Sequence, residues 1–254
     1  MSARIQSIER AAAILRLLSG RNRRLGVVQL AGELGLPKGT VHGILRTLAH
    51  VGFVEQDEET GKYQLGAALL HMGSSYLDGN ELRTRALNWS DALAARSGES
   101  VRIGTLHEGR VLVVHHVFRP DDSRQALEVG ALQPAHATAM GKVLLAAYRY
   151  VAEELSEADL AGYTPATITD RDALEAELRA VSERGWAEDV EELVVGEASL
   201  AAPIEDRRGV TVGAIGISGP VERLINGGAS RTDLVSYVRE TARAVSRDLG
   251  AIPW

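Results

Sequence analysis

The chain of 254 residues contains no cysteine. This absence excludes disulfide bonds, thiolate zinc sites and cysteine nucleophiles, and it is consistent with a reducing compartment. The sequence also lacks an apolar run of membrane-spanning length, and no apolar stretch behind a basic flank stands at its start. Low-complexity segments are absent too. We therefore expect a soluble cytoplasmic protein without a membrane partner, whose apolar fraction of 45% is sufficient for well-packed cores.

The sequence carries no recognisable catalytic constellation. Neither Ser199 nor Ser218 lies in a Gly-x-Ser-x-Gly elbow, and no carboxylate–histidine pair has catalytic spacing. His115 and His116 are adjacent on a predicted strand, so they point to opposite faces and cannot bind one metal ion together. A site that combines one of them with another histidine stays open, although structural roles fit better. We expect no catalytic residues, no metal site and no cofactor.

Charge is distributed unevenly along the chain. The net charge is −6, but residues 1–66 hold nine basic and six acidic residues, which leaves 19 basic and 28 acidic residues for the remainder. A basic N-terminal part joined to an acidic body indicates nucleic-acid binding confined to the N-terminal part. The basic loop 20–24 could lie near a phosphate backbone or be solvated, and the sequence leaves both open.

Residues 28–49 predict two short helices joined by a tight turn. In the second helix Val41, Ile44, Leu45 and Leu48 form one apolar stripe, and Gly35 suits the left-handed cap of the first helix. The opposite face of the second helix is polar and contains two glycines. Because a mid-helix glycine costs about 1 kcal/mol relative to alanine, these glycines indicate that a partner approaches the backbone. This pattern is typical of a helix-turn-helix.

Segments 52–56 and 62–65 predict a strand hairpin around the turn 57–61, which would form a wing. Its acidic tip, residues 57–59, would be repelled by phosphates. The alternative is a small helical subdomain without DNA-binding activity. The residues expected to contact DNA are Lys38, Gly39, Thr40, His42, Gly43, Arg46, Thr47 and, at the base of the wing, Lys62.

The body predicts an α+β domain with a largely antiparallel sheet. Helical segments 67–77 and 82–96 are separated by a weak point at 78–80, where we place the domain boundary. Predicted strands follow at 100–107, 111–118 and 124–129, and later at 186–191, 199–205 and 210–218. Predicted helices cover 137–148, 171–184 and 231–249.

Six segments resemble motifs of the IclR family of bacterial transcriptional regulators, in the family's order. They are IQSIERAAAIL at 5–15, GLPKGTVH at 35–42, GKYQLG at 61–66, HATAMGK at 136–142, GEASLAAP at 196–203 and IGISGP at 215–220. The resemblance implies a winged helix-turn-helix domain over 1–66, a linker helix over 67–80 and a GAF-like effector-binding domain over 81–254. It also implies assembly as dimers or dimers of dimers on double-stranded operator DNA.

The resemblance further implies an effector pocket beneath the start of the helix 137–148, where backbone N–H groups can hold an anion. Residues matched to this pocket are Arg124, Gln125, Thr138, Ala139, Met140, Gly141, Asp189, Ser199, Gly216 and Ser218. Ser199 stands where the family often has cysteine, and Gly216 replaces a serine, so we expect a more open pocket. Arg124 would suit an anionic polyol such as glycerol 3-phosphate. The alternative is that Arg124 pairs with Asp121, Asp122 or Glu128 at the surface.

The main hypothesis is a ligand-responsive repressor of a carbon-utilisation operon. One alternative is a metabolite-acting enzyme with an N-terminal regulatory module, and another is a dimerisation module that does not bind DNA. A single recognition helix covers too few bases for specificity, so we expect a dimer or tetramer. Ala11, Ile14 and Leu15, together with segment 69–77, are the predicted subunit contacts.

Overall fold

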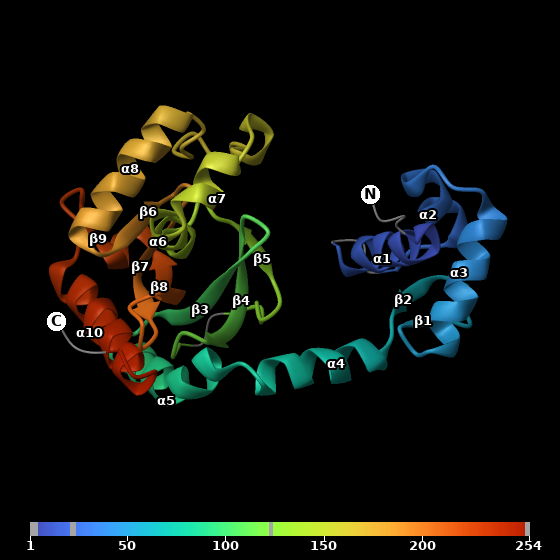
Figure 1. Ribbon diagram of the computed structural model, residues 1–254, viewed down its shortest axis with the longest axis horizontal. Helices are drawn as coiled ribbons and strands as arrows, with labels where there is room; N and C mark the ends of the chain where they lie inside the picture. Colours follow the sequence, from blue (N-terminus) through green and yellow to red (C-terminus); the bar gives the residue numbers. More distant parts are fainter. Residues whose placement is uncertain (1–4, 21–23, 122–123, 252–254) are drawn as a thin grey trace. The chain divides into compact units, whose positions relative to one another are not determined.

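The computed structural model describes residues 5–20, 24–121 and 124–251. Contacts divide the chain into two compact units, Met1–Gly79 and Asn80–Trp254, each with its own core (Figure 1). Residues 21–23 of the basic loop lie outside the described part of the chain. No helix among the described residues is both long enough and apolar enough to cross a membrane.

The first unit contains the predicted helix-turn-helix and wing. Its helices are α1 (Gln6–Ser19), α2 (Val27–Leu34) and α3 (Lys38–His50), and the wing strands are β1 (Val54–Gln56) and β2 (Tyr63–Leu65). Gly35 ends α2 in the left-handed region with φ of 61°, which lets its N–H reach the last carbonyls of α2. The apolar stripe of α3 packs into the core, where Val41 and Leu45 are fully buried.

Helix α1 packs against α3 within this core. Ile14 is fully buried there, so its predicted role in subunit contacts is wrong. Its side chain packs into the core of its own unit and is not accessible to a second subunit. Ala11 and Leu15 are half-buried. The helix α4 (Ala67–Asp78) is different, because none of its residues is buried. Leu70, Met72 and Tyr76 of α4 are 74%, 55% and 57% exposed.

The second unit is built on a six-stranded sheet of order β5-β4-β3-β8-β7-β6, in which every neighbouring pair is antiparallel. The strands are β3 (Ser100–His107), β4 (Arg110–Val117), β5 (Leu132–Pro134), β6 (Ala187–Val190), β7 (Glu197–Glu205) and β8 (Thr211–Pro220). The predicted α+β class with an antiparallel sheet is confirmed.

The predicted strand at 124–129 is wrong. The side chain of Gln125 accepts a hydrogen bond from the Arg119 N–H at 2.7 Å and donates one to the Arg119 carbonyl at 3.0 Å. These bonds close a loop after β4, so the chain reaches the sheet edge only at β5. Residues 124–128 are irregular as a result.

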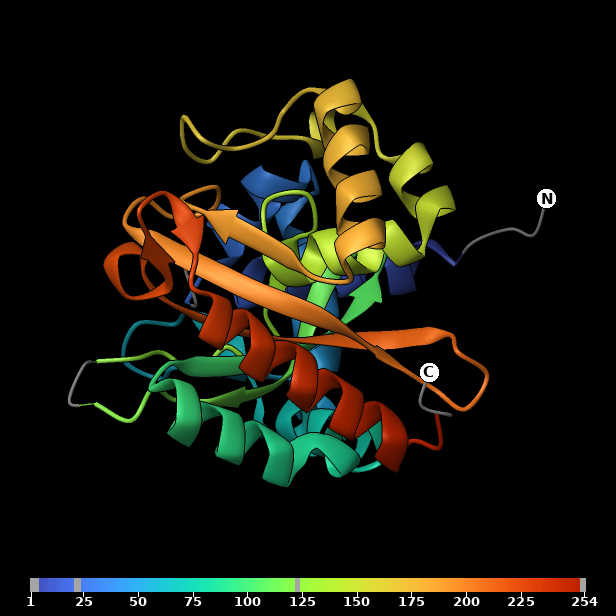
Figure 2. The same cartoon turned by 90° about the vertical axis from the view of Figure 1, so that its left-hand side faces the viewer.

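Helices cover both faces of the sheet. The helices α5 (Glu81–Ser97) and α10 (Thr232–Asp248) lie side by side on one face, and α6 (Ala139–Ala147) and α8 (Arg171–Arg184) lie on the other (Figure 2). Residues 213–219 of β8 are buried as a consequence. The remaining short elements are α7 (Arg149–Glu154), η1 (Glu157–Asp159), α9 (Val221–Leu224), β9 (Ile225–Asn226) and β10 (Ala229–Ser230). The layers leave the start of α6 pointing at β7 and β8.

Candidate functional site

The outer face of α3 carries the residues predicted to contact DNA. Lys38, Gly39, His42, Gly43, Arg46 and Thr47 are exposed, Thr40 is half-buried, and Lys62 is exposed directly before β2. A Cβ atom added at Gly39 or Gly43 would meet nothing within 4 Å. The packing of this unit therefore does not require glycine at these two positions.

The acidic wing tip is organised by Asp57. Its Oδ1 accepts hydrogen bonds from the Thr60 N–H and hydroxyl, both at 2.8 Å, and these bonds lower the pKa of Asp57. Its Oδ2 lies 3.3 Å from Nη1 of Arg24, which also donates to Gln64 through Nε at 3.0 Å. Arg24, the last residue of the predicted basic loop, is therefore held against the wing.

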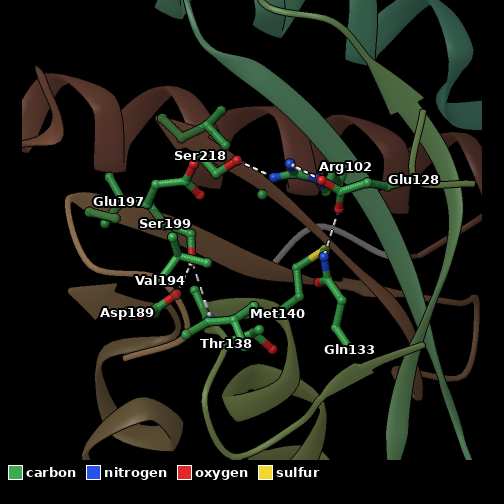
Figure 3. Close-up of a pocket in the computed structure, with 16 residues that line it drawn as sticks. Arg102, Glu128, Gln133, Thr138, Met140, Asp189, Val194, Glu197, Ser199 and Ser218 are labelled. Atoms are coloured by element: carbon green, nitrogen blue, oxygen red, sulfur yellow. Dashed lines mark hydrogen bonds and ion pairs between the residues drawn. The ribbon is translucent and has the colours of Figure 1, made fainter. Parts of the chain in front are cut away.

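A pocket of about 110 Å³ lies at the start of α6 in the second unit (Figure 3). Seven residues predicted for an effector site line it: Thr138, Ala139, Met140, Asp189, Ser199, Gly216 and Ser218. Gly141 lies behind them, where a Cβ atom would collide with the backbone of Ala135. Glycine is thus needed at position 141 for α6 to pack against the backbone of Ala135.

A chain of hydrogen bonds forms one wall of this pocket. Thr138 caps α6 by accepting from the Gly141 N–H at 3.2 Å. The Ala139 N–H donates to Ser199 Oγ at 3.4 Å, and Ser199 donates to Asp189 Oδ2 at 3.0 Å. Burial raises the pKa of Asp189, while hydrogen bonds from the Glu192 N–H and Ser199 oppose that rise. Ser199 therefore links the helix start to a buried carboxylate.

The opposite wall is charged, and sequence analysis missed it. Arg102 on β3 contacts Ser218 Oγ through Nη1 and Glu128 Oε1 through Nη2, the latter at 2.7 Å. Gln133 donates to Glu128 Oε2 at 2.8 Å, so Glu128 lies between the two (Figure 3). The sequence signal that could have found Arg102 is the two-residue alternation of side chains along a strand. It places Arg102 on the same face as Ser100, whose hydroxyl lies 3.0 Å from that of Ser218.

Besides Gly141, two predicted pocket residues do not line the pocket. Arg124 is exposed and Gln125 is bonded to the Arg119 backbone, so their placement in the pocket is wrong. Residues 124–128 are irregular, so the predicted strand that was to line the pocket does not form. Glu128, a suggested surface partner of Arg124, pairs with Arg102 instead.

Gly216 does not open the pocket. A Cβ atom at this position would lie 2.7 Å from the Leu200 carbonyl oxygen and 3.0 Å from Ala201 Cβ. Glycine there allows β8 to pack closely against β7 and Met140, rather than creating space for a ligand. The glycine at 216 thus gives no support to the expected opening of the pocket.

Behind the pocket lies a buried ion pair. Lys142 is fully buried, and its Nζ is 2.5 Å from Glu192 Oε1 and 3.8 Å from Glu177 Oε1. Burial raises the pKa of Glu192, and the charge of Lys142 opposes that rise. Because the Glu192 N–H donates to Asp189 Oδ1 at 2.8 Å, the pair is one hydrogen bond away from the pocket wall.

Three histidines of the second unit, His115, His116 and His136, are at least partly buried. Burial lowers the pKa of His115 and of His116, and it lowers the pKa of His136, whose Nε2 lies 3.0 Å from the Ala161 carbonyl oxygen. Within the described ranges, no group of three or more histidine or acidic side chains is placed to hold a metal ion.

Comparisons with known proteins cover both units. The pattern of the IclR helix-turn-helix domain matches residues 7–58, and that of the bacterial transcriptional regulator IclR C-terminal domain matches residues 74–247. The chain is 59% identical over 251 residues to the glycerol operon regulatory protein of Streptomyces coelicolor and 58% identical to that of Streptomyces griseus, with 99% of each chain covered.

A solved structure, the IclR transcriptional regulator from Alicyclobacillus acidocaldarius, has a TM-score of 0.80 and 28% identity to this chain. The match covers 98% of this chain and 100% of that one. Fold, domain order and sequence thus agree along the chain. It belongs to the IclR family of bacterial transcriptional regulators.

Proposed function

We propose that this protein is the effector-controlled repressor of an operon for glycerol use. The observation that carries the proposal is the identity of 59% with a glycerol operon regulatory protein across 99% of both chains. Family members are transcriptional regulators and not enzymes, which sets the enzyme alternative aside. The protein would act in the cytoplasm, where its operator lies.

The DNA-binding part of the proposal rests on the outer face of α3. This helix would enter the major groove with Thr40, His42 and Arg46 facing base edges, while Lys38 and Lys62 contact phosphates. Thr47 and the bare backbone at Gly39 and Gly43 would complete the contact. All of these residues except Lys62, which precedes β2, belong to α3, and all except the half-buried Thr40 are exposed.

A dimer or a dimer of dimers is the expected binding form. One recognition helix reads too few base pairs to select an operator from a genome. The exposed apolar side chains of α4, among them Leu70 and Tyr76, supply a surface that a second copy would cover. The operator would then be a palindrome or a repeat with matching half-site spacing.

The effector would be glycerol 3-phosphate or glycerol, bound in the pocket at the start of α6. Arg102 takes the role first expected of Arg124, because it is the arginine that lines this pocket. A phosphate would lie between its guanidinium and the N–H groups at the start of α6, with hydroxyls against Ser199 and Asp189. If the effector favours one subunit arrangement about a hundredfold, about 2.7 kcal/mol is available to release the operator.

A gel-shift titration on the DNA beside the protein's own gene tests this function. We expect a specific complex that persists against unrelated DNA and dissociates when glycerol 3-phosphate or glycerol is added. Sugars and dicarboxylates of similar size serve as control ligands. Specific binding that neither glycerol compound affects would reject the glycerol assignment. Absence of specific binding would reject the proposal that the protein regulates genes next to its own.

A further inference from the structure

Glu128 lies in the pocket as a ligand would. One oxygen of its carboxylate is 2.7 Å from Arg102 Nη2 and the other accepts from Gln133 Nε2 at 2.8 Å. All three side chains line the pocket, and Figure 3 shows Glu128 between the other two. A carboxylate that meets a guanidinium on one side and an amide on the other reproduces the recognition of a bound organic anion.

Glu128 itself belongs to no strand of the sheet. It follows β4 in an irregular segment, and its backbone N–H donates to His116 Nδ1 at 3.3 Å. Its side chain is 29% exposed, whereas that of Arg102 on β3 is 17% exposed. Rotation of the Glu128 side chain into solvent would therefore break no strand pairing, while Arg102 stays fixed by the ladder between β4 and β8.

Arg102 also has unused hydrogen-bonding capacity. Its Nε is buried and has no hydrogen-bond partner among the described residues. A guanidinium carries five N–H donors, and a buried donor without a partner is costly. An anion larger than a carboxylate, with three acceptor oxygens, could use more of these donors than Glu128 does. The cation is thus paired but not saturated.

We propose that Glu128 occupies, in the effector-free protein, the position on Arg102 that an anionic group of the effector takes. This inference rests on the effector function proposed above and specifies the ligand class: a small molecule with a phosphate or carboxylate that displaces an internal carboxylate. A ligand anion at the position of the Glu128 carboxylate would meet the same guanidinium and amide donors and would be repelled by that carboxylate, so Glu128 leaves when the ligand binds. A neutral polyol does not compete with it.

Competition with Glu128 sets the affinity and the selectivity of the pocket. The apparent dissociation constant is the intrinsic one divided by the fraction of molecules in which Arg102 is free of Glu128. The more often Glu128 covers Arg102, the weaker the observed binding. Anions that bind weakly, such as inorganic phosphate by itself, therefore do not displace Glu128. A ligand needs both the anionic group and the hydroxyl contacts to Ser199 and Asp189. Removal of the internal carboxylate should relax this requirement.

Calorimetric titration of full-length Glu128→Gln with glycerol 3-phosphate, inorganic phosphate and glycerol tests the proposal. We expect glycerol 3-phosphate to bind about tenfold more tightly than to wild type, inorganic phosphate to become detectable, and glycerol affinity to stay within about twofold. Glu197→Gln is the matched control, because Glu197 lines the same pocket and has no ion pair with Arg102 in the described structure. Glu197→Gln should change anion affinity less than Glu128→Gln does.

Unchanged or weaker anion binding by a folded Glu128→Gln variant would overturn the proposal. Operator binding and thermal melting like wild type identify a folded variant. If Glu128→Gln does not fold, Glu128→Ala removes the carboxylate and keeps both of its partners, Arg102 and Gln133; it should also tighten anion binding, and a loss of affinity there overturns the proposal instead.

The inorganic phosphate arm separates this inference from the glycerol assignment. If wild type binds neither glycerol compound, the assignment fails, but phosphate binding by Glu128→Gln that disappears in Glu128→Gln/Arg102→Gln still supports the inference. Absence of phosphate binding in Glu128→Gln overturns it.

Discussion

Lys142 and Glu192 form an ion pair of 2.5 Å in the interior of the second unit, and Glu192 is in turn tied to the pocket residue Asp189 through its backbone N–H. Removing one partner of a buried pair leaves the other charge without compensation. The pair therefore couples the stability of the domain to the shape of the pocket wall.

We expect Lys142→Met to lower the free energy of unfolding by about 3–5 kcal/mol, because Glu192 and Glu177 would face an apolar side chain. Lys142→Met/Glu192→Gln should recover part of this loss. Urea unfolding of the three proteins measures both effects. Equal stability of the double and the single variant would show that the pairing does not account for the loss.

Arg46→Ala should weaken operator binding by about 1–3 kcal/mol and relax the preference for the operator over other sequences. Arg46 is exposed on the polar face of α3, where its side chain is free to reach a base edge. Competition gel shifts with operator variants measure the preference. Arg179→Ala, at an exposed arginine of α8 paired with Glu175, is the control and should leave both properties unchanged.

Lys38→Ala tests the phosphate contact separately. It should weaken binding to all sequences alike and reduce the slope of log affinity against log salt by about 1. A change in sequence preference without a change in slope would place Lys38 at a base edge.

Gly43→Ala should separate folding from DNA binding. A Cβ atom at Gly43 meets nothing within 4 Å, so alanine should stabilise α3 by about 0.5–1 kcal/mol. The same methyl group would stand where the DNA approaches, and operator affinity should fall. Gly32→Ala in α2, also without a neighbour within 4 Å, is the control that should stabilise without this loss. Full operator affinity of Gly43→Ala would exclude close backbone approach.

The first unit was largely predictable because its signals are local. The spacing of Val41, Leu45 and Leu48 fixes the buried face of α3, and Gly35 marks the turn. The pocket was predictable in part, because Thr138, Ser199 and Ser218 stand in motifs with a recognisable order. Arg102 was missed because its role depends on the pairing of β3 with β8 and on a glutamate 26 residues away. The error at 124–128 arose because a side-chain bond of Gln125 outweighs local strand propensity.

Met72→Glu/Tyr76→Glu should dissociate the assembly into monomers with little effect on the fold of each copy. Both side chains are exposed on α4, so glutamate meets only solvent in the isolated chain but would place charge in an apolar subunit contact. Sedimentation velocity with and without operator DNA measures the change. Ser74→Glu/Ser75→Glu, at two exposed polar positions of the same helix, adds the same charge and is the control. A double variant that remains oligomeric would move the subunit contact away from α4.

Asp189→Asn should stabilise the domain at neutral pH and weaken effector binding. Burial raises the pKa of Asp189 in the folded state above that in the unfolded chain, so folding favours the protonated carboxyl. That contribution is present below pH of about 4 and is lost as pH rises through the folded-state pKa. The stability gained by Asp189→Asn should therefore grow as pH rises above about 4, as measured by urea unfolding.

Asparagine can still accept a hydrogen bond from the Glu192 N–H through its single oxygen. It lacks the second carboxylate oxygen that would accept a hydrogen bond from an effector hydroxyl. Asp57→Asn is the control of opposite sign, because hydrogen bonds from Thr60 lower the pKa of Asp57 and its contribution to stability is lost as pH falls. A stability gain for Asp189→Asn that is the same at all pH values would mean that the carboxylate is not penalised by burial.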